Sequence, residues 1–158
     1  MIIGVGADKS GFGLKEEIKN YLLEKQDVEI HDLGMTSPDE FKAYYQVAPV
    51  VAKKIQNGEI DKGILICGTG AGMAVAANKF KGVYAVSCES VYSAGMAKVV
   101  NNSNILTMGA WIIAPQIAIE MVETWLTKKF TEGFAEDRQK FLYNAFKEVE
   151  KIEEKEGH

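Results

Sequence analysis

The sequence is short of the residues that build most metal sites and disulfide frameworks. Its 158 residues include two histidines, His31 and His158, and two cysteines, Cys67 and Cys88. Two histidines are too few for a histidine-based metal site, so no metal is expected. Each cysteine lies in an apolar run, which favours reduced thiols in a cytoplasmic protein over a disulfide.

Long apolar runs and an excess of positive charge are also lacking. No apolar stretch approaches the roughly 20 residues that span a bilayer. The N-terminal MIIGVGADKSG has no basic leader and indicates a first strand, not an export signal. The net charge of −4 gives no reason to expect nucleic acid or an anionic membrane as a partner. An anionic substrate would therefore depend on local cations and backbone dipoles.

Short apolar runs alternate with longer amphipathic patterns along the whole chain. We expect strands at residues 2–7, 28–34, 63–67, 83–87 and 105–108. We expect helices at 12–25, from Ser37 or Asp39 as N-cap to 56, and at 73–80, 90–100, 115–129 and 134–154. This alternation predicts a doubly wound, three-layer α/β/α fold with a five-stranded parallel sheet. No linker or repeat divides the chain, so residues 1–158 are expected to form one domain, with the helix at 134–154 on the surface or between subunits.

Two of the predicted strands end in residues that can carry chemistry. In open α/β sheets, ligands bind beyond the carboxyl ends of the strands. The first strand ends at Asp8 and Lys9, and the third ends at Cys67. If these strands are neighbours, a carboxylate, an ammonium group and a thiol meet in one crevice.

The segment after the third strand reads Cys67-Gly-Thr-Gly-Ala-Gly72. Its three glycines allow backbone N–H groups to turn inward, and the following helix adds the positive end of its dipole. Such a loop binds an anion or stabilises an oxyanion, and a cysteine at a helix start gains thiolate character. A base beside an oxyanion hole is what enolisation next to a carbonyl requires, and Thr69 could relay a proton.

Two other interpretations remain open from the residues alone. Cys67 is a small core residue and the glycines make only a tight turn, or the loop binds a dinucleotide. The glycine spacing does not match G-x-G-x-x-G and follows the third strand, although Glu89 lies about 20 residues further on at a strand end.

The segment ILICGTGAGMAVAANKFKG resembles the signature of the ribose-5-phosphate isomerase B family, which also includes the galactose-6-phosphate isomerase subunits. The likeness continues through GADKSGFGLKEEI and LTMGA and covers nearly the whole chain. The resemblance implies a flavodoxin-like sheet and cofactor-free aldose–ketose isomerisation of a sugar phosphate through a cis-enediol. It also implies a homodimer or homotetramer with active sites at the subunit interface.

Position by position, the resemblance assigns Cys67 as the base, Thr69 as its hydroxyl helper and Asp8 as the acid at the first strand end. The substrate or its phosphate would be contacted by Lys9, Tyr44, Asn101 and Arg138. The anion hole would be formed by Gly68, Gly70, Ala71, Gly72, Met73 and Ala74.

Four positions depart from the family pattern. Lys9 and Val100 stand where most members have histidine, and Trp111 and Phe134 stand where many have arginine. The histidine replaced by Val100 is associated with ring opening, so we expect a substrate that is already open. A tetrose 4-phosphate cannot close a furanose, and VNNSNILTMGA resembles the branch of the family that acts on erythrulose 4-phosphate.

Several functions remain open at this stage. The expected substrate is of the ribose 5-phosphate/ribulose 5-phosphate type, with a tetrulose phosphate such as erythrulose 4-phosphate held beside it, and a hexose 6-phosphate or a uronate is the alternative. The chain could also be a binding module without turnover, or a non-catalytic subunit of a hetero-oligomer. The presence of Cys67 favours an active homo-oligomer, because binding alone needs the glycines and no thiol.

Overall fold

The computed structural model describes residues 1–156, so His158 lies outside the described residues. Five parallel strands form one sheet in the order β2-β1-β3-β5-β4. The strands are β1 (Ile2–Ala7), β2 (Glu29–Asp32), β3 (Lys62–Cys67), β4 (Ala85–Ser87) and β5 (Ile105–Gly109). The helices are α1 (Phe12–Leu23), α2 (Tyr44–Gln56), α3 (Ala71–Ala77), α4 (Val91–Val99), α5 (Pro115–Thr127) and α6 (Glu136–Glu156).

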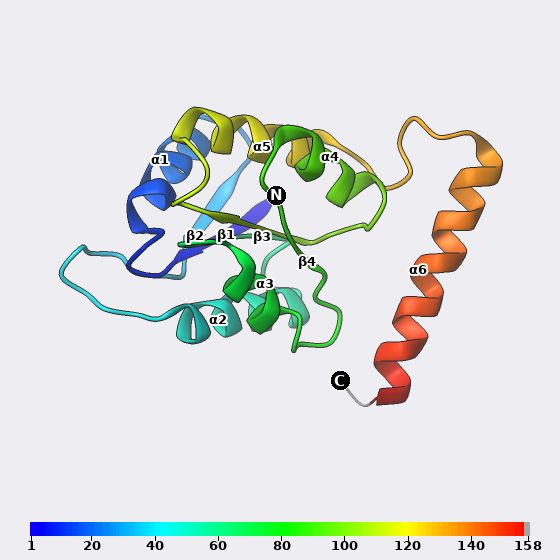
Figure 1. Cartoon of the computed structure of the whole chain (residues 1–158), viewed down its shortest axis with the longest axis horizontal. Coiled ribbons are helices and arrows are strands. Elements are labelled where there is room, and N and C mark those ends of the chain that lie inside the picture. Colours follow the sequence, from blue (N-terminus) through cyan, green and yellow to red (C-terminus); the bar gives the residue numbers. More distant parts are fainter. Residues whose placement is uncertain (157–158) are drawn as a thin grey trace.

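Helices cover both faces of this sheet. Figure 1 shows α1, α4 and α5 on one face and α2 and α3 on the other. Each face has its own apolar core, with Ile3, Ile64 and Trp125 on the first side and Leu65, Val51 and Met73 on the second. The predicted doubly wound α/β fold is confirmed. Compared with the flavodoxin order 2-1-3-4-5, the last two strands have exchanged places.

Helix α6 stands beyond the β4 edge of the sheet (Figure 1). It contacts the body through the ring of Phe146, whose centroid lies 4.8 Å from that of Tyr84, and through Glu153, which accepts a hydrogen bond from the Gly82 amide at 2.8 Å. The helix begins at Glu136 and continues to Glu156, close to the predicted bounds. None of the described helices is both long and apolar enough to cross a membrane.

Helix α2 begins later than predicted. The Ser37 hydroxyl accepts a hydrogen bond from the Asp39 amide at 3.2 Å, which closes a local turn. The helix starts only at Tyr44, where the Gln46 side chain accepts a hydrogen bond from the Ala43 amide at 2.9 Å. Ser37 and Asp39 are therefore turn residues and not N-caps, because the chain needs residues 36–43 to cross from β2 to the other face of the sheet.

The register of the sheet defines two edges. Strands β1 and β3 are neighbours, with Ala7 paired to Ile66, so Asp8 and Cys67 lie at the same carboxyl edge. At the opposite, amino edge, the carbonyl oxygen of Asn104 accepts a hydrogen bond from the Gly63 amide at 2.9 Å. Residues just before β5 therefore lie at the amino edge. They are one strand length away from the residues just after β3, which lie at the carboxyl edge.

Candidate active site

Cys67 is the last residue of β3, and its side chain is enclosed, with 5% of the residue exposed. The Gly70 amide donates a hydrogen bond to Cys67 Sγ at 3.1 Å. This contact fixes the position of the sulfur at the start of the glycine loop.

The loop from Cys67 to Gly70 is shaped by β5. Gly70 has φ +80°, and a Cβ there would lie 2.7 Å from the carbonyl carbon of Met108, so only glycine fits. Thr107 Oγ1 donates to the Gly70 carbonyl oxygen at 2.9 Å. These contacts hold the amide that faces Cys67 Sγ in a fixed position.

Backbone amides of the predicted anion hole follow this loop. The N–H groups of Ala71, Gly72 and Met73 stand in the first turn of α3 and have no intrahelical acceptor. The Ala74 amide is already bonded to the Gly70 carbonyl oxygen at 3.2 Å. Ala74 thus stabilises the turn, and the donors available to a ligand come from the residues before it.

Two aromatic rings flank the loop. The Tyr44 ring lies 3.1 Å from the position that a Cβ on Gly72 would occupy, and the Trp111 ring lies 2.8 Å from the corresponding position on Gly68. Trp111 remains 75% exposed. Tyr44 therefore lies beside Gly72, and Trp111 lies beside Gly68.

Asp8 lies at the same sheet edge as Cys67, as predicted, but the Lys9 ammonium is directed to another segment. Asp8 Oδ1 accepts hydrogen bonds from the amides of Ser10 and Gly11 at 2.9 and 3.1 Å. Burial raises the pKa of Asp8, although these two bonds lower it in part. The Lys9 ammonium donates to the Pro38 carbonyl oxygen, so it lies along the loop before α2. Thr69, in the glycine loop, is exposed.

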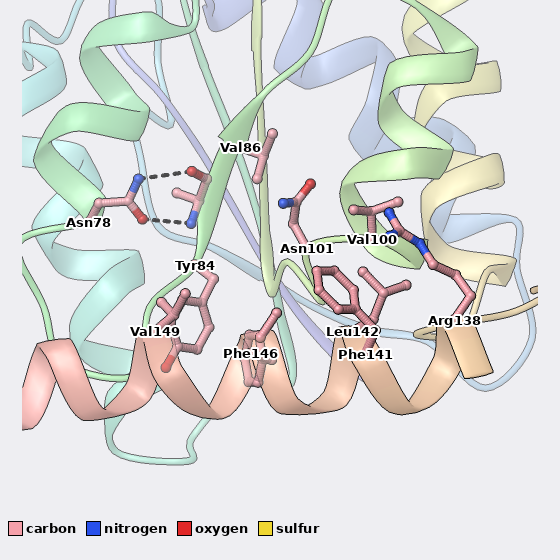
Figure 2. Close-up of a pocket in the computed structure, with 12 residues that line it drawn as sticks. Asn78, Tyr84, Val86, Val100, Asn101, Arg138, Phe141, Leu142, Phe146 and Val149 are labelled. Atoms are coloured by element: carbon pink, nitrogen blue, oxygen red, sulfur yellow. Dashed lines mark hydrogen bonds between the residues drawn. The ribbon is translucent and has the colours of Figure 1, made fainter. Parts of the chain in front are cut away.

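Asn101 and Arg138 lie at the other edge of the sheet. Together with Val100 they line a cavity of about 420 Å³ between α6 and the β4 side of the body. Figure 2 shows Arg138 reaching from α6 toward Val100 and Asn101, while Asn78 is paired with the backbone of Ala85. A five-residue strand spans roughly 16 Å. One chain therefore does not bring Asn101 and Arg138 to Cys67.

Sequence reasoning missed the surroundings of Arg138. Its guanidinium lies over the Phe134 ring, 5.9 Å from the centroid, and over the Phe141 ring, 4.9 Å from the centroid. Within residues 1–156, Arg138 forms no ion pair. The spacing of Arg138 and Phe141, three residues apart on one helix, was the available signal.

No group of three or more His, Cys, Asp or Glu side chains within residues 1–156 is arranged to hold a metal ion. The groups gathered at the carboxyl edge are instead a thiol, a carboxylate and a row of amides. Such groups can remove a proton from carbon and hold the negative oxygen that forms.

Comparison with known proteins identifies the family. The model of the Ribose/Galactose Isomerase family matches residues 3–142. The chain belongs to this family. It is accordingly an aldose–ketose isomerase with the α/β fold of this family.

Individual relatives cover most of this isomerase. It is 53% identical over 154 residues to the 4-deoxy-4-sulfo-D-erythrose isomerase of Clostridium sp. (strain MSTE9), covering 98% of this chain and 96% of that one. It is 37% identical to the D-erythrulose-4-phosphate isomerase of Pectobacterium atrosepticum, covering 83% and 86%. The structure of ribose-5-phosphate isomerase B from Clostridium thermocellum superimposes with a TM-score of 0.88 at 34% identity, over 99% and 100% of the two chains.

Proposed function

We propose that this isomerase interconverts the aldose and ketose forms of an open-chain four-carbon sugar that ends in a sulfonate, as in 4-deoxy-4-sulfo-D-erythrose. The observation that carries the proposal is the chemistry of the cavity that Val100, Asn101 and Arg138 line at the amino edge of the sheet. Among the described residues of one chain, Arg138 is the only charged one that lines it, and Val100 offers no group that exchanges a proton. Identity over nearly the full length to an isomerase of this substrate supports the same assignment.

The substrate suits these residues for two reasons. A sugar with sulfur on C4 has no C4 hydroxyl, so it cannot close a furanose ring and needs no group to open one. A sulfonate carries one negative charge, whereas a phosphate monoester carries about −1.5 to −2 at neutral pH. One guanidinium neutralises the charge of a sulfonate but leaves part of the charge of a phosphate without a partner.

At the other end of the substrate, Cys67 removes the proton from C2 of the aldose. The amides of the glycine loop hold the enediolate oxygen that forms, and the proton returns to C1 while the O2 proton moves to O1. Thr69 and Asp8 act in the proton transfer between the two oxygens. The net result is the ketose, with no change in the number of atoms or electrons and no cofactor in the scheme.

The two groups of residues would meet between two copies of the chain. Cys67 and its loop from one copy would face Asn101 and Arg138 of a second copy, since one chain holds them at opposite edges. Exposed apolar side chains at the start of α2, beside the glycine loop, on α3 and on α6 support such an assembly, namely Phe41, Tyr45, Trp111, Val75, Phe141 and Ile152.

The test is a substrate panel in D₂O, followed by proton NMR. The purified chain is given 4-deoxy-4-sulfo-D-erythrose, D-erythrulose 4-phosphate and D-ribose 5-phosphate. We expect isomerisation and deuterium entry at the carbon next to the carbonyl to be fastest on the sulfonate. Preference for erythrulose 4-phosphate would favour the second candidate, which the Pectobacterium relative and Val100 both support.

The panel includes two matched cysteine variants. Cys67→Ala should lower the exchange rate by about 10²–10⁴-fold, because the base is lost. Cys88→Ala is the control, since Cys88 is also buried but lies in the core on the other face of the sheet. Equal activity of the two variants would rule out Cys67 as the base.

A further inference from the structure

The guanidinium of Arg138 is held by two aromatic rings. It lies over Phe134, which precedes α6, and over Phe141, one turn further along the helix. Arg138 and Phe141 are both exposed, where the attraction between a cation and the face of a ring is modest, and this attraction does not neutralise the charge. The rings therefore orient Arg138 and leave its N–H edge available to an anion.

Phe134 is itself fixed by the backbone around it. The Thr131 amide donates to the Val99 carbonyl oxygen at 2.8 Å, which ties this loop to the end of α4. Gln139 Nε2 donates to the Phe134 carbonyl oxygen at 2.7 Å. Arg138 and Phe141 line the same cavity as Val100 and Asn101, and these backbone contacts keep the Phe134 ring against Arg138.

Within residues 1–156 of one chain, Arg138 is the only charged residue that lines this cavity, and it is the only arginine in the sequence. Its other walls are largely apolar, with Val86, Leu142 and Phe146 among them. In a facing copy, the Lys9 ammonium would already be engaged by the Pro38 carbonyl oxygen. A second negative charge on a ligand would therefore meet no second cation of the cavity's own chain.

We propose that Phe134 and Phe141 are positioning residues that hold Arg138 as a single-guanidinium clamp, selective for a terminal group with one negative charge. This inference rests on the proposed function, because it takes the sulfonate of the substrate as the ligand. The planar guanidinium presents two parallel N–H groups to two sulfonate oxygens. The rings limit the side-chain freedom that a free arginine would lose on binding.

The experiment compares steady-state kinetics on 4-deoxy-4-sulfo-D-erythrose and D-erythrulose 4-phosphate. Phe134→Leu should raise KM for the sulfonate by about 2- to 30-fold, the range given by the strength of a cation–π contact, with kcat little changed. Phe134→Tyr keeps a ring and should restore KM. Phe130→Leu is the control, because Phe130 packs on Tyr143 and Phe146 and not on Arg138.

A charge variant tests the selectivity. Phe134→Lys adds a second cation beside Arg138 and should shift the ratio of kcat/KM values toward the phosphate. Phe141→Leu, at a position 57% exposed, gives the same KM test if Phe134→Leu does not fold. Circular dichroism and thermal unfolding check that each variant is folded.

Each outcome decides a separate point. Unchanged KM in both leucine variants, or a fall in kcat alone, would overturn the positioning role. An unchanged substrate ratio in Phe134→Lys would overturn the selectivity. A wild-type chain that turns over only the phosphate would overturn the proposed substrate and the single-charge preference. In that case, KM for the phosphate in the leucine variants would still decide whether the rings position Arg138.

Discussion

Gly68 and Trp111 make a contact that leaves no room for a methyl group. A Cβ on Gly68 would lie 2.8 Å from the indole ring. Because the ring is mostly exposed and can rotate away, Gly68→Ala should cost only about 1 kcal/mol of unfolding free energy, at the lower end for overpacking. It should lower kcat/KM, since the displaced ring no longer walls the glycine loop.

A double-mutant cycle measures this contact. In a Trp111→Ala background, Gly68→Ala should lose most of its effect on stability, measured by thermal unfolding, and on kcat/KM. An equal effect in both backgrounds would mean that the indole ring is not what requires glycine at position 68.

Single residues differed in how far the sequence could place them. Cys67 and its glycines were predictable because a buried strand, a thiol and a glycine loop are consecutive in the chain. The stack of Phe134 on Arg138 was not, since it depends on how the loop after α5 returns to the end of α4. That loop turns at Thr131, which has φ +65° and whose amide bonds to Val99. No local pattern encodes this long-range contact.

At the scale of one element, α4 carries Lys98, whose positive charge is costly to bury. Burial, followed by repulsion from Lys62, lowers the pKa of Lys98 to about 7. Between pH 7 and its ordinary value of 10.5, the unfolded chain therefore binds a proton at Lys98 that the folded chain lacks. Stability from this group rises with pH over that window, and below it the full cost of burying the charge is present.

Lys98→Met should accordingly raise the midpoint of thermal unfolding most at about pH 6. The gain should shrink as the pH rises from 7 toward 10. Lys147→Met, which changes an exposed lysine on α6, is the control and should show no such trend. A gain from Lys98→Met that is independent of pH would contradict the assignment of the low pKa to Lys98.

The elements themselves were largely predictable from the sequence. The central strands β1, β3 and β5 are mainly apolar and almost entirely buried, because both faces of the sheet are covered, whereas the edge strand β2 reads EIHD. The start of α2 was not predictable, because Ser37 and Asp39 are good N-caps in isolation. The turn that they form instead is set by the distance the chain must cover between layers.

At the scale of the whole molecule, the proposed two-copy site predicts complementation. Cys67→Ala and Arg138→Ala should each be nearly inactive alone. The two variants are then unfolded together and refolded. Random pairing in a dimer of two-fold symmetry makes half of the dimers hybrids, and each hybrid has one intact site. Activity should return to about a quarter of the wild-type value.

The same experiment can contradict the arrangement. If Cys67 and Arg138 act within one chain, every site in a hybrid lacks one of them, and mixing restores nothing. Refolding each variant separately and then mixing without exchange is the control. The spacing of residues in one chain does not predict this assembly, because Cys67 and Arg138 lie far apart in the fold; the expectation of a shared site came from the family resemblance alone.

On this arrangement, each chain donates a base to one site and a guanidinium to another. A duplicated gene can therefore lose Cys67 in one copy and Arg138 in the other, while the two products together still form one working centre per pair. The fold offers a short evolutionary route from a self-sufficient enzyme to an obligate partnership of two different gene products. Such a pair has one working active site in place of two identical ones. That site can therefore adapt to a new sugar without a second site changing with it.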